Sequence, residues 1–437
     1  MKRYKLKIIY FTLLLLPFFA SCTDEDILQK GGVTEGVPTI VDISVGTAAN
    51  TAKTRSALLE SEERKIYDLY LWVFNSSGNM EFSREYSRKE LYQAATDLET
   101  STGEKDDDAP TSMGLLKNIS LTTGEKTLFL LANYKSDGDG LFHVKPEVLN
   151  GISKYSDLEK IKASMIQHTL FRPSGNLLMS LTKNVTVSQT TKRLDVALER
   201  SEAKVTFNIK TADGLTFNPE TYIIGNIPNS TFITSHAKGT EQTAEWDAGG
   251  TDEKEYWKSD PFHFEGNETT STFTFYTPEN RKNAKQMITP FSPGYNVQKK
   301  GYDLRQKQVK TALPDKTEKP NLGNGETVYA PTCAPYIEFT GDLQQKMTPT
   351  DSSPAERFGR VTYRIYLGYT SETDPVNDYD LERNVHYTYN VQINGVNDLV
   401  IEAKSDKDKE DERAPGWKVL FMTPIVPSPL TATTNKD

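Results

Sequence analysis

The feature that most constrains the fold is a change of parity within residues 193–209, RLDVALERSEAKVTFNI. Apolar side chains occupy even positions before the polar junction at 199–202 and odd positions after it. Alternation with a period of two is typical of a strand with one buried face, and a shift of one residue turns every side chain to the other face. A continuous strand here must bulge or pass from one sheet to another, so we interpret the junction as a hinge between two β domains. The even set is Leu194, Val196 and Leu198, and the odd set is Ala203, Val205, Phe207 and Ile209.

Length and composition agree with two β domains. At 437 residues the chain is too long for one ordinary domain. Its 36% apolar and 10% aromatic residues include 21 tyrosines, a composition that favours strands. A few short helices are expected, the best of them over 156–166, where the sequence SDLE at 156–159 fits a capping box. The predicted fold class is therefore mainly β.

The beginning of the chain predicts export. Four basic residues among the first seven precede an apolar run from Ile8 to Ala20, which as a helix spans only about 20 Å of a hydrocarbon core about 30 Å thick. We interpret residues 1–21 as a signal peptide. The sequence FASC at 19–22 resembles a bacterial lipoprotein cleavage box with Cys22 as the lipidated residue, and ordinary signal cleavage is the alternative. Residues 22–36 are then expected to be a polar tether.

Charge and motifs exclude several functions. The formal charge is −9, and without the four basic leader residues it is 47 − 60 = −13, which argues against nucleic acid as a partner. The five histidines lack metal-ligand spacing, and no HExxH, CxxC, P-loop or GxSxG motif occurs. With Cys22 lipidated, Cys333 has no internal partner for a disulfide. No catalytic residue, metal site or cofactor is predicted, and the chain is not expected to be an enzyme.

Several strings in this order resemble the fimbrillin family, the shaft and accessory subunits of type V pili of Gram-negative gut and oral bacteria. They are the lipoprotein leader, TRS (54–56), LFLLANY (128–134), LERSEAKVTF (198–207), FYTPEN (275–280), YAP (329–331), YIE (336–338), YRIYLG (363–368) and RNVHY (383–387).

The resemblance implies two tandem transthyretin-like β-sandwich domains, which we place at 37–200 and 201–403, followed by a charged linker and apolar tail at 404–437. It also implies an arginine-specific protease that cuts the Arg55-Ser56 bond of a lipidated precursor. The strand Val37 to Val45, with Val41, Ile43 and Val45 on one face, would then be displaced.

The partner in that exchange would be another pilin subunit, whose C-terminal tail replaces the lost strand. The matching segment here is 417–426, WKVLFMTPIV, although its prolines limit pairing after Met422. One face would carry Val419, Phe421, Thr423 and Ile425, and the other would carry Leu420 and Met422. The tail as the last strand of its own domain is the alternative.

The implied function is a structural subunit of an adhesive extracellular fimbria, made as an outer-membrane lipoprotein precursor and then placed at the cell surface. Shaft, anchor and tip roles all stay open, as does the surface receptor. A second class is a surface glycan-binding lipoprotein for nutrient uptake, with Trp246, Tyr256 and Trp257 as the candidate sugar platform.

Overall fold

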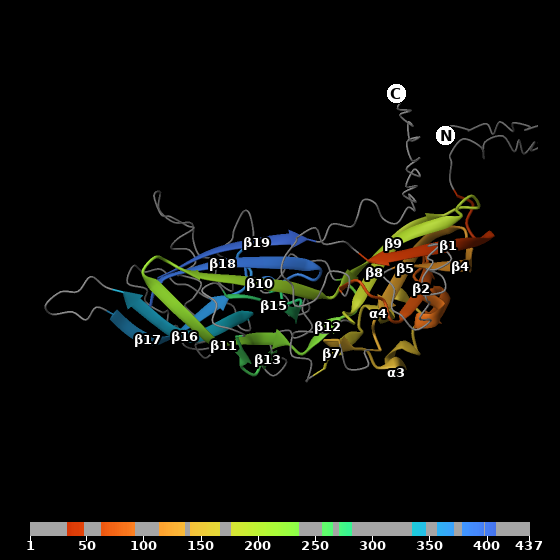
Figure 1. Cartoon of the computed structure of the whole chain (residues 1–437). Helices are drawn as coiled ribbons and strands as arrows, with labels where there is room; N and C mark the ends of the chain where they lie inside the picture. The colour runs from red at the N-terminus through yellow and green to blue at the C-terminus, as the bar shows by residue number, and fades with distance from the viewer. Residues whose placement is uncertain are drawn as a thin grey trace, which may run out of the picture.

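The computed structural model describes residues 33–47, 63–91, 113–135, 140–166, 176–235, 256–264, 271–281, 334–346, 356–370, 378–396 and 398–407. Its strands form two β-sandwiches that lie end to end, with a small layer of short elements beside the junction (Figure 1). The predicted fold class, mainly β with two tandem sandwiches and a few short helices, is confirmed.

The N-terminal sandwich is built from one folded path of seven strands in the order β3-β2-β5-β8-β9-β1-β4. Strands β8 and β9 pair only where Met179 faces Arg200 and Ser180 faces Glu199, so the path divides there into two layers. Both layers contribute to one apolar core, which includes Val41, Leu71 and Leu130. The strands are β1 (Pro38–Thr47), β2 (Leu69–Asn75), β3 (Met80–Tyr86), β4 (Met113–Thr122), β5 (Gly124–Ala132), β8 (Met179–Val187) and β9 (Arg193–Arg200).

The C-terminal sandwich has a four-stranded sheet, β15-β10-β18-β19, and a second sheet ordered β13-β11-β16-β17, with β14 paired to β11. Its core is rich in stacked aromatic rings, such as Phe207 on Tyr389 with centroids 4.7 Å apart. The strands are β10 (Glu202–Thr211), β11 (Leu215–Pro228), β13 (Tyr256–Lys258), β14 (Phe262–His263), β15 (Ser271–Pro278), β16 (Tyr336–Lys346), β17 (Glu356–Tyr366), β18 (Val385–Gly395) and β19 (Asp398–Lys407).

The change of parity falls between β9 and β10, which lie in different sheets and are separated by Ser201 alone. Val196 and Leu198 belong to the core of the N-terminal sandwich. All four odd positions of the second run, from Ala203 to Ile209, belong to the other apolar cluster. The chain therefore passes from one core into the other, because the register of its buried side chains shifts by one residue at the junction.

The small layer beside the junction consists of β6 (Phe142–His143), α3 (Pro146–Leu149), α4 (Tyr155–Leu158), β7 (Lys162–Met165) and β12 (Ser230–Phe232). β12 follows the C-terminal strand β11 but pairs with β7, so this sheet contains segments from both sides of the junction. The apolar cluster that fills the C-terminal sandwich continues through this layer to Trp72 and Phe129 of the N-terminal one.

The prediction of a helix over 156–166 was wrong for most of that range. Only α4 is helical, and its capping box lies two residues before the predicted one at 156–159: Asp157 accepts the backbone N–H of the N-cap residue Lys154 at 2.9 Å. The following residues form β7, whose Ala163 and Met165 are buried in alternation and whose edges pair with β12 and β6. Tertiary pairing on both edges outweighed an apolar spacing that was equally compatible with a helix.

Candidate functional site

β1 is an interior strand of the N-terminal sandwich, between β4 and β9. It runs antiparallel to β4 over most of its length and parallel to β9 from Asp42 to Thr47. Val41, Ile43 and Val45 have no exposed surface, and all three lie in the sandwich core. Removing β1 would therefore open two strand edges and an apolar gap together.

The register of β1 against β4 is fixed by a bulge. Val41 pairs with Ile119 and Ile43 pairs with Leu116, so β4 carries one extra residue opposite Asp42. The carboxylate of Asp42 accepts the backbone N–H of Asn118 at 2.9 Å, and Asn118 has a φ of 58°. A strand that takes the place of β1 must fit this irregular edge.

The chain leaves β1 and returns to the described structure at the same place. β1 ends at Thr47, which pairs with Leu198 near the end of β9. The described chain resumes at Glu63, whose Oε2 lies 2.5 Å from Nη1 of Arg200. Arg200 is the last residue of β9, two residues beyond Leu198. Residues 48–62 thus connect two points beside the domain junction.

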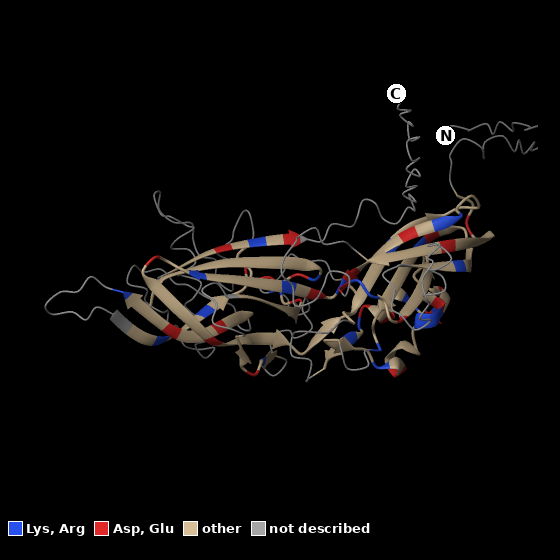
Figure 2. Cartoon of the chain, in the orientation of Figure 1, with Lys and Arg blue, Asp and Glu red and all other residues tan. Residues whose placement is uncertain are grey.

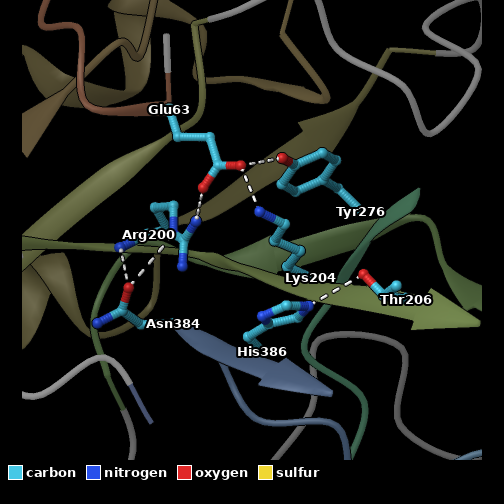
Figure 3. Close-up of polar contacts among 7 residues, drawn as sticks. All are labelled: Glu63, Arg200, Lys204, Thr206, Tyr276, Asn384 and His386. Carbon is cyan, nitrogen blue, oxygen red and sulfur yellow. Dashed lines mark hydrogen bonds and ion pairs between the residues drawn. The ribbon is translucent and has the colours of Figure 1, made fainter. Parts of the chain in front are cut away.

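Glu63 is the centre of a buried polar cluster at this junction (Figure 3). Besides Arg200, its carboxylate accepts hydrogen bonds from Nζ of Lys204 at 2.7 Å and from the hydroxyl of Tyr276 at 2.5 Å. Nε of Arg200 donates to Oδ1 of Asn384 at 3.4 Å. Since Glu63 precedes β2 and its partners lie on β9, β10 and β15, the cluster joins the two sandwiches.

The partners lie in register across the C-terminal sheet. Lys204 of β10 pairs with Tyr276 of β15 on one side and with His386 of β18 on the other. Nε2 of His386 lies 3.0 Å from the hydroxyl of Thr206, which belongs to the next row on the same face. The even positions of β10 therefore form a polar face, which Glu63 covers at its junction end.

Burial alone would raise the pKa of Glu63, but Arg200 and Lys204, with hydrogen bonds from Lys204 and Tyr276, hold it below its ordinary value. Burial also lowers the pKa of His386 to about 4, and the positive charges of Lys204 and Arg200 act in the same direction. The cluster therefore holds an ionised carboxylate between two cations, beside a neutral imidazole, at neutral pH.

Two further buried carboxylates lie at the same end of β10 and β15. Glu279 pairs with Arg383 at 2.6 Å and with Arg281 at 2.8 Å. Burial raises the pKa of Glu202 to about 7, although the backbone N–H of Leu178 donates to its Oε1 at 3.2 Å. Along the ribbon of both sandwiches, Lys and Arg are interspersed with Asp and Glu (Figure 2).

A sequence comparison places the N-terminal sandwich and the start of β10 in a known family. Residues 40–206 match the model of the family described as major fimbrial subunit protein (FimA). Over these residues the chain belongs to the fimbrillin family. Residues 275–391 match a second model, described as a domain of unknown function (DUF4906). No curated protein matches the sequence.

Two solved structures are similar to this chain at low identity. The tip fimbrial protein Mfa3 from Porphyromonas gingivalis, solved with a C-terminal truncation, is 13% identical, with 84% of this chain and 99% of that chain covered and a TM-score of 0.45. A fimbrilin (fimA) from Porphyromonas gingivalis is 12% identical, with coverages of 84% and 96% and a TM-score of 0.42.

The structure describes part of the site that the sequence predicted. Val41, Ile43 and Val45 lie in β1 and are buried, while their displacement stays a prediction. Tyr256 and Trp257 lie in β13, where both are half-buried and Trp257 packs against the apolar core. The other predicted residues lie outside the described residues: Cys22, Arg55, Ser56, Trp246, Val419, Leu420, Phe421, Met422, Thr423 and Ile425.

Sequence reasoning missed the Glu63 cluster. Lys204 on the polar face of an alternating strand, just after the polar residues at 199–202, was the available signal, but nothing local identifies Glu63 as its partner. Among the described residues, no three or more His, Cys, Asp or Glu are grouped as metal ligands, and none of the helices there has the length and apolar character to cross a membrane.

Proposed function

We propose that the chain is a structural subunit of an adhesive extracellular fimbria, exported as a lipoprotein through Cys22, cut after Arg55 and polymerised by strand exchange. Its role is structural, with no catalysis. The position of β1 carries this proposal: a core strand between two partners, followed by a connection that leaves and rejoins the fold beside the junction. The proposal extends the family assignment, which concerns fimbrial subunits.

The energetics of β1 support exchange rather than simple loss. Three fully buried side chains, Val41, Ile43 and Val45, contribute about 1.5–3 kcal/mol each by burial. Their removal also leaves backbone groups of β4 and β9 without partners in a partly apolar groove. A subunit without β1 therefore has a strong drive to bind a replacement strand.

The proposed replacement is the segment 417–426 of another subunit. Its residues Val419, Phe421 and Ile425 repeat with the period of two that β1 uses. Because the segment carries Pro424, it lacks one backbone donor, and pairing is expected to be strongest up to Met422. The charged stretch before it would serve as the connection between subunits.

The test is processing of purified lipid-free precursor with an arginine-specific endoproteinase. Detergent-resistant, heat-labile ladders are expected after cleavage, together with loss of β1 from the product mass. Arg55→Ala should abolish both. Arg84→Ala is the matched control, since Arg84 is an exposed arginine on β3 that pairs with Glu90. Ladders that form equally well with Arg55→Ala would refute the processing step.

The same experiment separates subunit roles. A shaft subunit is expected to polymerise alone after the cut. An anchor subunit is expected to stay uncut and lipidated at Cys22, and a tip subunit to accept a strand only from other pilins. Material that stays monomeric with every pilin tested would argue against a fimbrial role.

A further inference from the structure

Two arginines lie between β1 and β2. The proposed processing site is Arg55, and the second, Arg64, directly follows Glu63. An enzyme that cuts after arginine meets both the Arg55-Ser56 bond and the Arg64-Lys65 bond. We propose that the Glu63 cluster protects the Arg64-Lys65 bond and so confines processing to Arg55, an inference that rests on the processing step proposed above.

The bond is held on its N-terminal side by Glu63. Glu63 is 3% exposed, and its carboxylate accepts hydrogen bonds from Arg200, Lys204 and Tyr276. These partners belong to three strands that are themselves parts of sheets. Moving Glu63 into solvent would leave two buried cations without their carboxylate partner, so the residue before Arg64 is firmly fixed.

The bond is held on its C-terminal side by Asn133. The carbonyl of Lys65 accepts Nδ2 of Asn133 at 2.8 Å, and the backbone N–H of Tyr67 donates to Oδ1 of the same side chain at 2.8 Å. Asn133 is fully buried and also donates to the carbonyl of Leu177 at 2.8 Å. Ile66, between the two bonded residues, is 1% exposed.

Proteases cut chain that opens to an extended form, and the cleavage rate in a folded protein follows the population of that open form. For Arg64, opening requires Glu63 and Ile66 to leave their buried positions together. Glu63 therefore determines where the protease cuts, because it holds the adjacent Arg64-Lys65 bond in the folded structure. A cut at Arg64 would break the covalent link between Glu63 and β2.

The experiment uses the full chain with Arg55→Ala, so that cleavage after Arg64 is measured without competing cleavage after Arg55. Each variant is treated with an arginine-specific endoproteinase under conditions where circular dichroism shows it folded, and the product that begins at Lys65 is followed by mass spectrometry. Adding Glu63→Gln should raise its rate of formation by at least about ten-fold, the factor that about 1.4 kcal/mol gives. Tyr276→Phe, which removes one hydrogen bond from Glu63, should give a smaller increase in the same product.

Glu279→Gln is the matched control, because Glu279 is an equally buried carboxylate that is paired with Arg281 and Arg383 instead of with Arg200 and Lys204. It should leave cleavage at Arg64 unchanged. Cutting at Arg64 that is as fast with Glu63 intact as with Glu63→Gln overturns the inference, and so does an equal increase with Glu279→Gln. An unmodified chain that is not cut at Arg55 counts against the proposed function, whereas the response of Arg64 to Glu63→Gln still decides the inference.

Discussion

The hydroxyl of Tyr276 donates a hydrogen bond to Oε1 of Glu63 at 2.5 Å, between residues that lie 213 positions apart in the sequence. This bond and the ion pairs of Glu63 connect the segment before β2 to the C-terminal sheet. The domain junction is therefore held by polar contacts as well as by the continuous apolar cluster.

Tyr276→Phe tests the strength of this connection. Loss of a hydrogen bond to a charged, buried carboxylate should lower the free energy of unfolding by about 1.5–3 kcal/mol, measured by urea denaturation. Tyr155→Phe is the control, because it removes a hydroxyl contact at 3.1 Å to the uncharged Thr182 and should cost about 1 kcal/mol or less. Equal losses would show that the charge of Glu63 adds nothing.

Ile43→Ala tests how much β1 contributes to the uncut chain. Ile43 has no exposed surface in the N-terminal core, so a cavity should cost about 2–5 kcal/mol of unfolding free energy. Ile40 on the same strand is 58% exposed, and Ile40→Ala should stay within about 0.5 kcal/mol. Thermal or urea unfolding distinguishes the two, and a small effect of Ile43→Ala would contradict a buried β1.

Glu202→Gln tests the raised pKa at the junction. The pKa of Glu202 is about 7 in the folded chain against an ordinary 4.5, so the folded state favours its protonated form. The stability that this raised pKa contributes is fully present below about pH 4.5 and is lost as the pH rises through about 7. Glutamine does not titrate, so the variant should gain stability over the unmodified chain from pH 4.5 to 8, by on the order of 3 kcal/mol at most.

Glu90→Gln should show the opposite dependence on pH. Hydrogen bonds from Ser87 hold the pKa of Glu90 below its ordinary value. The stability that its carboxylate contributes is present above the ordinary pKa and is lost as the pH falls below it. Denaturation midpoints measured across pH 3 to 8 check both variants, and slopes of the same sign would contradict the assignment.

Gly368→Ala tests a close backbone approach after β17. Gly368 has a φ of 87°, and an added Cβ would lie 2.5 Å from the carbonyl oxygen of Asp378. We expect a loss of at least about 2 kcal/mol in unfolding free energy. Gly359→Ala on β17 is the control, since nothing lies within 4 Å of its added Cβ, and it should change stability by no more than about 0.5 kcal/mol.

The sequence was most informative where the pattern is local. The shift from Leu198 to Ala203 predicted that the chain passes between two β cores there, because alternation depends only on which neighbours along the strand are apolar. The same reasoning predicted a buried face at Val41, Ile43 and Val45. It was weaker over 156–166, where one apolar spacing suited both a helix and β7.

Residue type and periodicity were enough to predict the β class, the two cores and the identity of the first strand. Tertiary structure alone decided that β1 lies between β4 and β9, that β12 pairs with β7 across the junction, and that Glu63 meets Lys204 and Tyr276. Strand edges and buried charges can pair with many candidates along a chain. Only the folded arrangement selects among them, because the cost of an unpaired buried group depends on what surrounds it in space.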